Sequence, residues 1–312
     1  MQAAEPGLDQ ARPTDPRTAL TGNRAVLVLL IVQNVVGGGL PALHVPLGWA
    51  LVASFVASAL VFGVFFRAPL GALFASRRWR TPPAPWVALG GLLLALVASR
   101  GVTLFVASVW PQSFQGVASF TGTGLGLWLL LVGAGLLIPL AEEVAFRGLL
   151  LPGYERVRPA VQAGFLAALV FAGAHGLPGQ ALAILPLAWV LVRAVQHSGS
   201  FWTGYLIHAG NNLLAVWLGS ALSQNKTLDT LANGLGTVPL GFGLGGLLVG
   251  AAALWLATSW LRPRDLPATP PGTGPVWSGS LIVIVVLVVL LALSALLAAL
   301  FPQFFPGLPG GV

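Results

Sequence analysis

The sequence predicts an all-α fold, a polytopic bundle of about nine transmembrane helices with an eight-helix core and one C-terminal span. Two observations lead to this prediction. Of the 312 residues, 56% are hydrophobic and only 7% are charged, whereas about a quarter of a soluble domain is charged. The apolar residues also gather into stretches of about 20, the length that crosses a ~30 Å hydrocarbon layer as a helix. These observations exclude a soluble enzyme, a disordered protein and a nucleic-acid-binding domain.

The apolar stretches give the order of the elements. They cover approximately residues 25–43, 46–66, 86–110, 123–146, 160–176, 181–196, 201–222, 239–261 and 276–301. Two of them, 160–176 and 181–196, are short, and we expect them to form a tight helical hairpin that need not cross the bilayer fully.

The remaining segments set the predicted domain organisation. Residues 1–23 are polar, lack the apolar core of a signal peptide and are predicted to be a flexible cytoplasmic tail. Residues 24–261 form the core, with its motif-bearing helices over 123–222. A Pro/Gly/Thr-rich linker is predicted over 262–275, before the last span at 276–301 and a tail at 302–312.

The basic residues predict the orientation of the chain. If every apolar stretch crosses the membrane, twelve arginines lie on the same side of it: Arg12, Arg17, Arg24, Arg67, Arg77, Arg78, Arg80, Arg156, Arg158, Arg193, Arg262 and Arg264. Only Lys226 falls on the other side. By the positive-inside rule we expect a multi-pass protein of the cell membrane with a cytoplasmic N-terminus. The net charge of +7 is then a consequence of membrane topology and implies no nucleic-acid partner.

Charged side chains at the end of the fourth stretch are the first candidates for a functional site. A charge within the bilayer is costly and is therefore a functional hypothesis by default. Glu143 and Arg147 are four residues apart in the order that favours a helical ion pair. Glu142 points about 100° away from Glu143, so one carboxylate can pair with arginine while the other acts as a general base. The alternative is a charge cluster at the membrane interface.

Three further polar positions lie within apolar stretches. His175 ends the fifth stretch, and His208 and Asn212 share a helix face in the seventh. Arg100 lies deep in the third and has no local partner. Each has a structural alternative: hydrogen bonding between helices for the histidines and the asparagine, and snorkelling or structural pairing for Arg100. Together, an acid, two imidazoles and an amide match the needs of water activation and oxyanion stabilisation.

The pattern resembles the CAAX-protease and bacteriocin-processing (CPBP, or Abi) family of intramembrane endopeptidases. That family carries EExxxR, FxxxH and HxxxN in this order on successive helices. Here they stand as Glu142-Glu143-xxx-Arg147, Phe171-xxx-His175 and His208-xxx-Asn212. The resemblance covers about residues 124–222. It implies a helical core with a water-accessible chamber near the cytoplasmic face and a peptide or protein substrate.

Members of the family differ in substrate. Eukaryotic and archaeal members remove the last three residues of prenylated CAAX proteins, and bacterial members act in peptide processing, bacteriocin self-immunity and signalling. The composition here, with more Arg than Lys and many Ala, Leu, Gly and Pro, resembles that of a high-GC bacterial protein. This disfavours a prenylated substrate.

A mechanism follows as a hypothesis. Glu142 is expected to be the general base, holding a water molecule together with His175, and to return the proton to the leaving amine. His208 and Asn212 are expected to donate hydrogen bonds to the oxyanion.

Two points complete this hypothesis. Glu143 and Arg147 are expected to orient the helix and position Glu142. Glu142, His175 and His208 are also a His/His/Glu set that suits zinc with one open position. We favour the mechanism without a metal or other cofactor.

Other chemistries and functions are considered on the same sequence. There is no HExxH motif, no GxSG before a transmembrane histidine and no cysteine, which argues against zincin, rhomboid and thiol chemistry. An intramembrane aspartyl dyad is excluded because all the aspartates lie outside the stretches: Asp9, Asp15, Asp229 and Asp265. Two alternatives remain: an ion-coupled transporter, suggested by the glycines at 37–39 and Pro41, and a non-catalytic scaffold or immunity protein.

Overall fold

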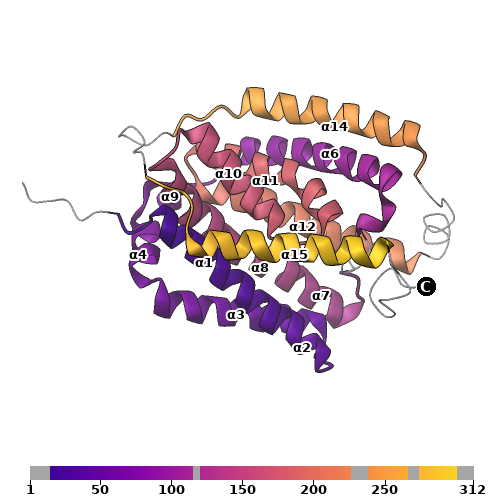
Figure 1. Ribbon diagram of the computed structural model, residues 1–312, viewed down its shortest axis with the longest axis horizontal. Coiled ribbons are helices and arrows are strands. Elements are labelled where there is room, and N and C mark those ends of the chain that lie inside the picture. Colours follow the sequence, from indigo (N-terminus) through magenta and orange to yellow (C-terminus); the bar gives the residue numbers. More distant parts are fainter. Residues whose placement is uncertain (1–14, 115–119, 226–237, 266–273, 301–312) are drawn as a thin grey trace, which may run out of the picture.

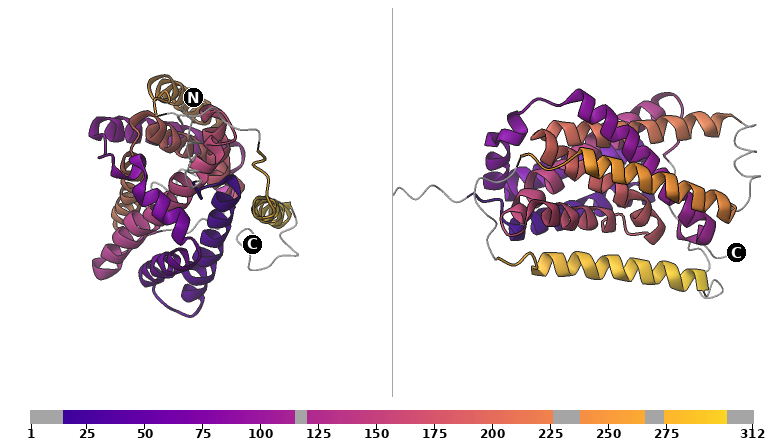
Figure 2. Two further views of the ribbon diagram at one scale, coloured as in Figure 1. Left: turned by 90° about the vertical axis from the view of Figure 1, so that its left-hand side faces the viewer. Right: turned by 90° about the horizontal axis from the view of Figure 1, so that it is seen from above.

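Every regular element in the described part of the chain is a helix. The computed structural model describes residues 15–114, 120–225, 238–265 and 274–300. The long helices run side by side along one direction (Figure 1), and the end-on view shows that they form a bundle (Figure 2). Within the described ranges, six helices are long and apolar enough to cross a membrane, and shorter apolar helices accompany them. The predicted class, a polytopic helical membrane bundle, is confirmed.

The helices follow the predicted order. The N-terminal part contains α1 (Ala19–Val32), the π-helix η1 (Gln33–Gly38), α2 (Gly39–Ala42), α3 (Leu47–Phe65), α4 (Arg67–Ala75), α5 (Arg77–Arg80), α6 (Pro85–Val109) and the 3-10 helix η2 (Pro111–Phe114). The rest contains α7 (Gly124–Val132), the π-helix η3 (Gly133–Leu137), α8 (Ile138–Glu143), the π-helix η4 (Val144–Leu150), α9 (Leu151–Glu155), α10 (Ala160–Gly173), α11 (Pro178–Ser198), α12 (Phe201–Gln224), α14 (Leu240–Trp260) and α15 (Gly279–Leu300). The short helices α4 and α5 occupy a segment in which the sequence predicted no helix.

Some predicted features involve residues outside the described ranges. They are most of the tail 1–23, most of the linker 262–275, Lys226 and the tail 302–312.

The first helix begins inside the segment predicted to be a flexible tail. The sequence predicts a tail through residue 23, whereas α1 begins at Ala19. Thr18 caps the helix, because its side-chain oxygen accepts a hydrogen bond from the backbone N–H of Thr21 at 3.1 Å. This bond satisfies one of the free donors at a helix N-terminus. The core therefore starts earlier than the apolar pattern indicates.

The fourth predicted span is a longer helix with two changes of geometry. The sequence predicts an end at residue 146, but the helix continues from Gly124 to Glu155. The π-helical segments η3 and η4 lie on either side of α8. Such wider turns are frequent at functional sites. Pro139 lies in the first turn of α8, directly after η3, so the helix passes through the proline.

The helices α10 and α11 form the predicted hairpin but differ in length. The 14 residues of α10 reach only about 21 Å, which is less than the hydrocarbon layer. The 21 residues of α11 are enough to cross. Helix α11 begins at Pro178 and ends before Gly199, which has φ of +65°, an arrangement typical of helix ends. The expectation of a short helix holds for α10 alone.

Arginine-rich segments meet at one end of the bundle. Arg78 forms ion pairs with Glu155 and Asp265, each at 2.7 Å, and Gln196 Nε2 donates to Glu155 at 2.9 Å. Burial opposes the charge of Arg78, but the carboxylates of Glu155 and Asp265 together outweigh this effect and raise the pKa of Arg78. Segments far apart in the sequence thus share one end of the bundle, as their assignment to one side of a membrane requires.

The last helix is attached to the core through a buried asparagine. Asn23 Nδ2 donates to the Val276 carbonyl at 2.9 Å and to Ser278 Oγ at 2.8 Å, and the Tyr154 hydroxyl donates to Asn23 Oδ1 at 2.7 Å. Helix α15 itself lies at the outside of the bundle (Figure 2). These contacts hold the residues that lead directly into the peripheral helix.

Helices α6 and α14 pack closely through glycines. A Cβ atom on Gly101 would lie 2.8 Å from the Cα of Gly250 and closer still to the carbonyl oxygen of Gly246. In a membrane, where lipid is as apolar as the helix surface, small residues allow the close packing that holds helices together. Gly101 therefore supports the contact between α6 and α14.

Replacing Gly101 with valine is expected to lower the free energy of unfolding by about 1–3 kcal/mol, because the added side chain overpacks this crossing. Gly245→Val is the matched control, since a Cβ there meets no atom within 4 Å. The measurement is thermal unfolding in detergent. Equal destabilisation by both substitutions would show that only the helix propensity of glycine and valine matters.

Candidate active site

Helix α8 places two adjacent carboxylates in different surroundings. Glu143 is fully buried, whereas the side chain of Glu142 retains 14% of its exposure and lines a cavity. The neighbours of Glu142 on the helix, Ala141 and Val144, face a separate apolar pocket. The predicted divergence of the two acids is therefore observed.

Glu143 contacts both a cation and a histidine. Its Oε1 lies 3.0 Å from Nη1 of Arg147, at the predicted i,i+4 spacing, and 2.9 Å from Nδ1 of His208. Arg147 is itself buried, and its Nη2 donates to the carbonyl of Ala188 at 3.3 Å. Gly204 leaves room for this carboxylate, because a Cβ there would lie 3.3 Å from Glu143 Oε2. Glu143 thus connects α8 to α12.

His208 lies between the two acids. Its Nδ1 faces Glu143, and its Nε2 lies 3.5 Å from Oε2 of Glu142. A hydrogen bond to one ring nitrogen fixes the direction in which the other points. Glu143 therefore directs Nε2 of His208 toward Glu142.

Phe171 packs against three of the polar side chains. Its ring centroid lies 4.4 Å from the guanidinium carbon of Arg147, 5.1 Å from the His175 ring centroid and 5.4 Å from that of His208. The first contact is a cation–π interaction. The phenylalanine of the FxxxH pattern therefore holds both imidazoles and the arginine in place.

His175 and Asn212 complete the set. His175 lies in the turn after α10, and its Nδ1 is 2.9 Å from the Phe171 carbonyl oxygen. That bond makes Nδ1 the donor and leaves Nε2 as an acceptor. Asn212 Nδ2 donates to the Ala134 carbonyl at 3.1 Å, and its Oδ1 accepts from Asn211 at 3.1 Å. One hydrogen of the Asn212 amide remains for a further partner.

Four of the predicted residues line one cavity of about 260 Å³: Glu142, His175, His208 and Asn212. The other two, Glu143 and Arg147, lie behind them and contact His208 or each other. Side chains from α8, α12 and the turn after α10 thus come together at one place. We refer to this space as the polar cavity.

A metal fits this arrangement less well than the residue types suggest. The candidate ligands Glu142, His175 and His208 all line the polar cavity. In the described part of the chain, however, no three His, Asp, Glu or Cys side chains are placed so that they could hold a metal ion. No chemical step below is therefore assigned to a metal.

Sequence reasoning did not single out two polar residues of the polar cavity. Asn211 and Gln180 both line it, and Asn211 also donates to Asn212. Asn211 stands beside a motif asparagine inside an apolar stretch, a signal that could have identified it. Gln180 lies near the start of α11, where a polar residue is unremarkable in sequence.

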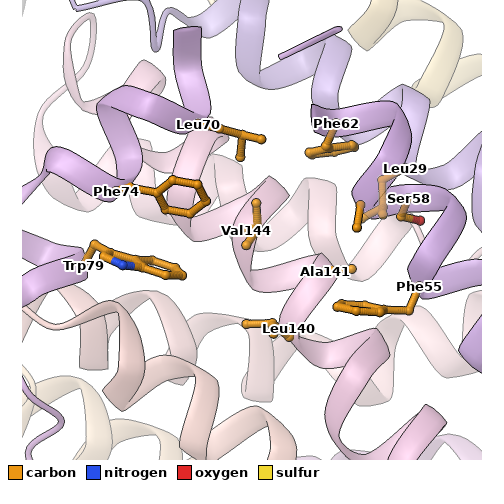
Figure 3. A pocket seen from close by; sticks show the side chains of 11 residues that line it. Leu29, Phe55, Ser58, Phe62, Leu70, Phe74, Trp79, Leu140, Ala141 and Val144 are labelled. Carbon is orange, nitrogen blue, oxygen red and sulfur yellow. The ribbon is translucent and has the colours of Figure 1, made fainter. Parts of the chain in front are cut away.

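A second pocket, on the other face of α8, is apolar (Figure 3). It has a volume of about 230 Å³ and is lined mainly by aliphatic and aromatic side chains, among them Phe55, Phe62 and Phe74. The hydroxyl of Ser58 in its wall is already bonded to the carbonyl of Ser54, at 2.8 Å. This pocket offers an apolar surface and no group suited to hydrolysis.

Comparison with known families agrees with the motifs. Residues 124–214 match the family model described as type II CAAX prenyl endopeptidase, Rce1-like. The match covers less than a third of the 312 residues but includes all three motifs. It confirms the resemblance to CAAX-type endopeptidases predicted from them. Comparisons with curated proteins and with solved structures gave no match.

Proposed function

We propose that this multi-pass membrane protein is an endopeptidase that hydrolyses a peptide bond with a water molecule activated by Glu142. One observation carries the proposal: Glu142, His175, His208 and Asn212, from three segments of the chain, line a single cavity. The family match to CAAX-type endopeptidases supports the same reaction class. The substrate is a peptide or protein.

Water activation is assigned to Glu142 and His175. Nε2 of His175 accepts a hydrogen bond from the water, because its Nδ1 is committed to the Phe171 carbonyl. The Glu142 carboxylate takes one proton as the water oxygen bonds to the carbonyl carbon. When the carbon–nitrogen bond breaks, Glu142 returns this proton to the leaving amine.

Oxyanion stabilisation is assigned to His208 and Asn212. In its doubly protonated form, His208 donates from Nδ1 to Glu143 and from Nε2 to the developing oxyanion. The free hydrogen of the Asn212 amide is the second donor. Donors that are already oriented cost no reorganisation during the reaction. Glu143 and Arg147 are positioning residues, since they act through His208 and Glu142.

The arginine-rich end of the bundle indicates how the chain is oriented in the membrane. A cytoplasmic N-terminus places this end at the cytoplasmic face. His208 is seven residues after Phe201, the first residue of α12, which corresponds to about 11 Å along the helix. This depth supports a chamber near the cytoplasmic face of the cell membrane. The chain has no cysteine of its own, so labelling of single cysteines introduced at each end of the bundle, from each side of sealed vesicles, tests the orientation.

Peptide profiling tests the proposed activity. Cells that express the active chain are compared with cells that express Glu142→Gln, and peptides and membrane-protein termini are identified by mass spectrometry. Fragments present only with the active chain identify the substrate and the cleaved bond. Identical profiles, with both proteins expressed equally, would contradict the proposal.

Hydrolysis is expected to be insensitive to metal removal, since the proton transfers are assigned to side chains. The measurement is the rate of cleavage by purified, lipid-reconstituted protein before and after treatment with EDTA or 1,10-phenanthroline, with metal analysis of the same sample. Loss of activity that zinc restores would instead assign Glu142, His175 and His208 to a metal site.

A further inference from the structure

Arg100 is a charged residue inside a membrane span that the proposed chemistry does not use. It is fifteen residues after Pro85, the first residue of α6, or about 22 Å along the helix. Its side chain is exposed, and none of the ion pairs among described residues includes it. An unpaired charge at this depth is costly. We therefore ask which group the residues around Arg100 would allow to pair with it.

Arg100 lines a cavity of about 410 Å³. The same wall carries Ser99 and Thr103, and Ser99 Oγ is buried without a hydrogen-bond partner among the described residues. The wall of the cavity thus carries a cation, and an unpaired hydroxyl group is buried beside it. The guanidinium of Arg100 is available to a polar ligand.

This cavity adjoins the polar cavity. The two share several lining residues, namely Phe120, Gln180, Ile184, Leu187, Asn211 and Ala215. On α12, the lining continues from His208 in one to Gly219 in the other. These two residues are eleven apart, or about 16 Å along the helix. An extended peptide covers that distance with about five residues.

The chemistry of arginine indicates what this space would bind. A guanidinium presents a planar fork of N–H donors that matches a carboxylate, and it remains charged under all physiological conditions. We propose that Arg100 binds a carboxylate of the peptide substrate, a few residues away from the bond cleaved at Glu142. This inference rests on the proposed peptidase function and adds a specificity-determining residue to it.

Two sources could supply the carboxylate: the free C-terminus of the peptide, or the side chain of an acidic residue near the cleaved bond. Binding experiments can separate them without requiring turnover. The probe is a fluorescein-labelled random nonapeptide library with free C-termini, compared with the same library amidated. Two further amidated libraries carry a fixed Glu or a fixed Gln at the fourth position from the end.

The libraries are titrated against Glu142→Gln protein in lipid nanodiscs, with and without Arg100→Gln. With Arg100 present, we expect a Kd about tenfold lower for one carboxylate-bearing library than for its neutral counterpart, as for a charge-assisted pair. Arg100→Gln should remove that difference and leave the neutral library unchanged. Arg67→Gln, at an exposed arginine that bonds the Gly63 carbonyl, should change nothing.

Further controls separate this proposal from a structural role. Arg100→Lys keeps the charge but loses the fork, and it should retain only part of the preference. Thermal unfolding confirms that each variant is folded. The proposal would be overturned if protein with Arg100 bound the carboxylate and neutral libraries with equal affinity. It would also be overturned if Arg100→Gln lowered the affinity for both kinds of library equally. A preference at Arg100 without any hydrolysis by the unsubstituted enzyme would overturn the peptidase function alone.

Discussion

Replacing Glu142 with glutamine is expected to reduce peptide hydrolysis by about 10²–10⁴-fold, the range typical of losing a general base. Glutamine has nearly the same shape but cannot take a proton from water. Stability should change little, because among the described residues the Glu142 carboxylate pairs with Nε2 of His208 only at the long distance of 3.5 Å. The measurement is cleavage of a cognate peptide by purified protein in lipid, with thermal unfolding of the same sample.

Glu143→Gln is the matched control for this substitution, since it changes the adjacent carboxylate in the same way. Glu143 is fully buried and bonded to His208 and Arg147, so its replacement should lower both stability and activity. Full hydrolysis by Glu142→Gln would contradict the assignment of the base. Loss of stability equal to that of Glu143→Gln would indicate that Glu142 has a structural role.

Arg147→Met is expected to destabilise the protein by about 3–5 kcal/mol, because it leaves the charge of a buried carboxylate uncompensated. Arg147 is 2% exposed and lies 3.0 Å from Glu143, which is fully buried. The Phe171 ring would also lose its cation–π contact. The measurement is equilibrium unfolding in detergent, followed by near-ultraviolet circular dichroism.

A double substitution isolates the charge effect. Glu143→Gln combined with Arg147→Met removes both charges, and it should recover part of the stability that Arg147→Met loses. Strictly additive losses in the double variant would show that the pair is not coupled. In that case Arg147 would stabilise the core through its packing on Phe171 and its hydrogen bond to the Ala188 carbonyl.

The sequence predicts the bundle well because membrane spans depend mainly on hydropathy. The start of the first helix was placed too late because Thr18 caps it from within a polar segment. The fourth helix was ended too early because residues through Glu155 remain helical at the arginine-rich end. Glu155 is acidic, so hydropathy gives no sign that the helix continues to it.

The candidate site could be assembled from spacing only in part. The pairing of Glu143 with Arg147 follows from the i,i+4 rule and is observed. Glu143 and His208 are bonded to each other although they are 65 residues apart in the sequence. No local pattern predicts this contact. The same holds for the position of Arg100 in a cavity that adjoins the polar cavity. Contacts between distant helices depend on packing, which a single sequence does not encode in any periodic form.

The two π-helical segments around α8 have a consequence for how this helix can change. One residue more or less rotates everything beyond it by about 100°, which in an unbroken α-helix would turn the acids away from their cavity. A wide turn is a place where such a length change is absorbed locally. Leu125 and Trp128 lie on the exposed outer side of the helix. Their direction around the helix axis therefore need not fix the direction of Glu142 and Glu143. The part of this helix before η3 can therefore gain or lose a residue while the orientation of Glu142 is preserved.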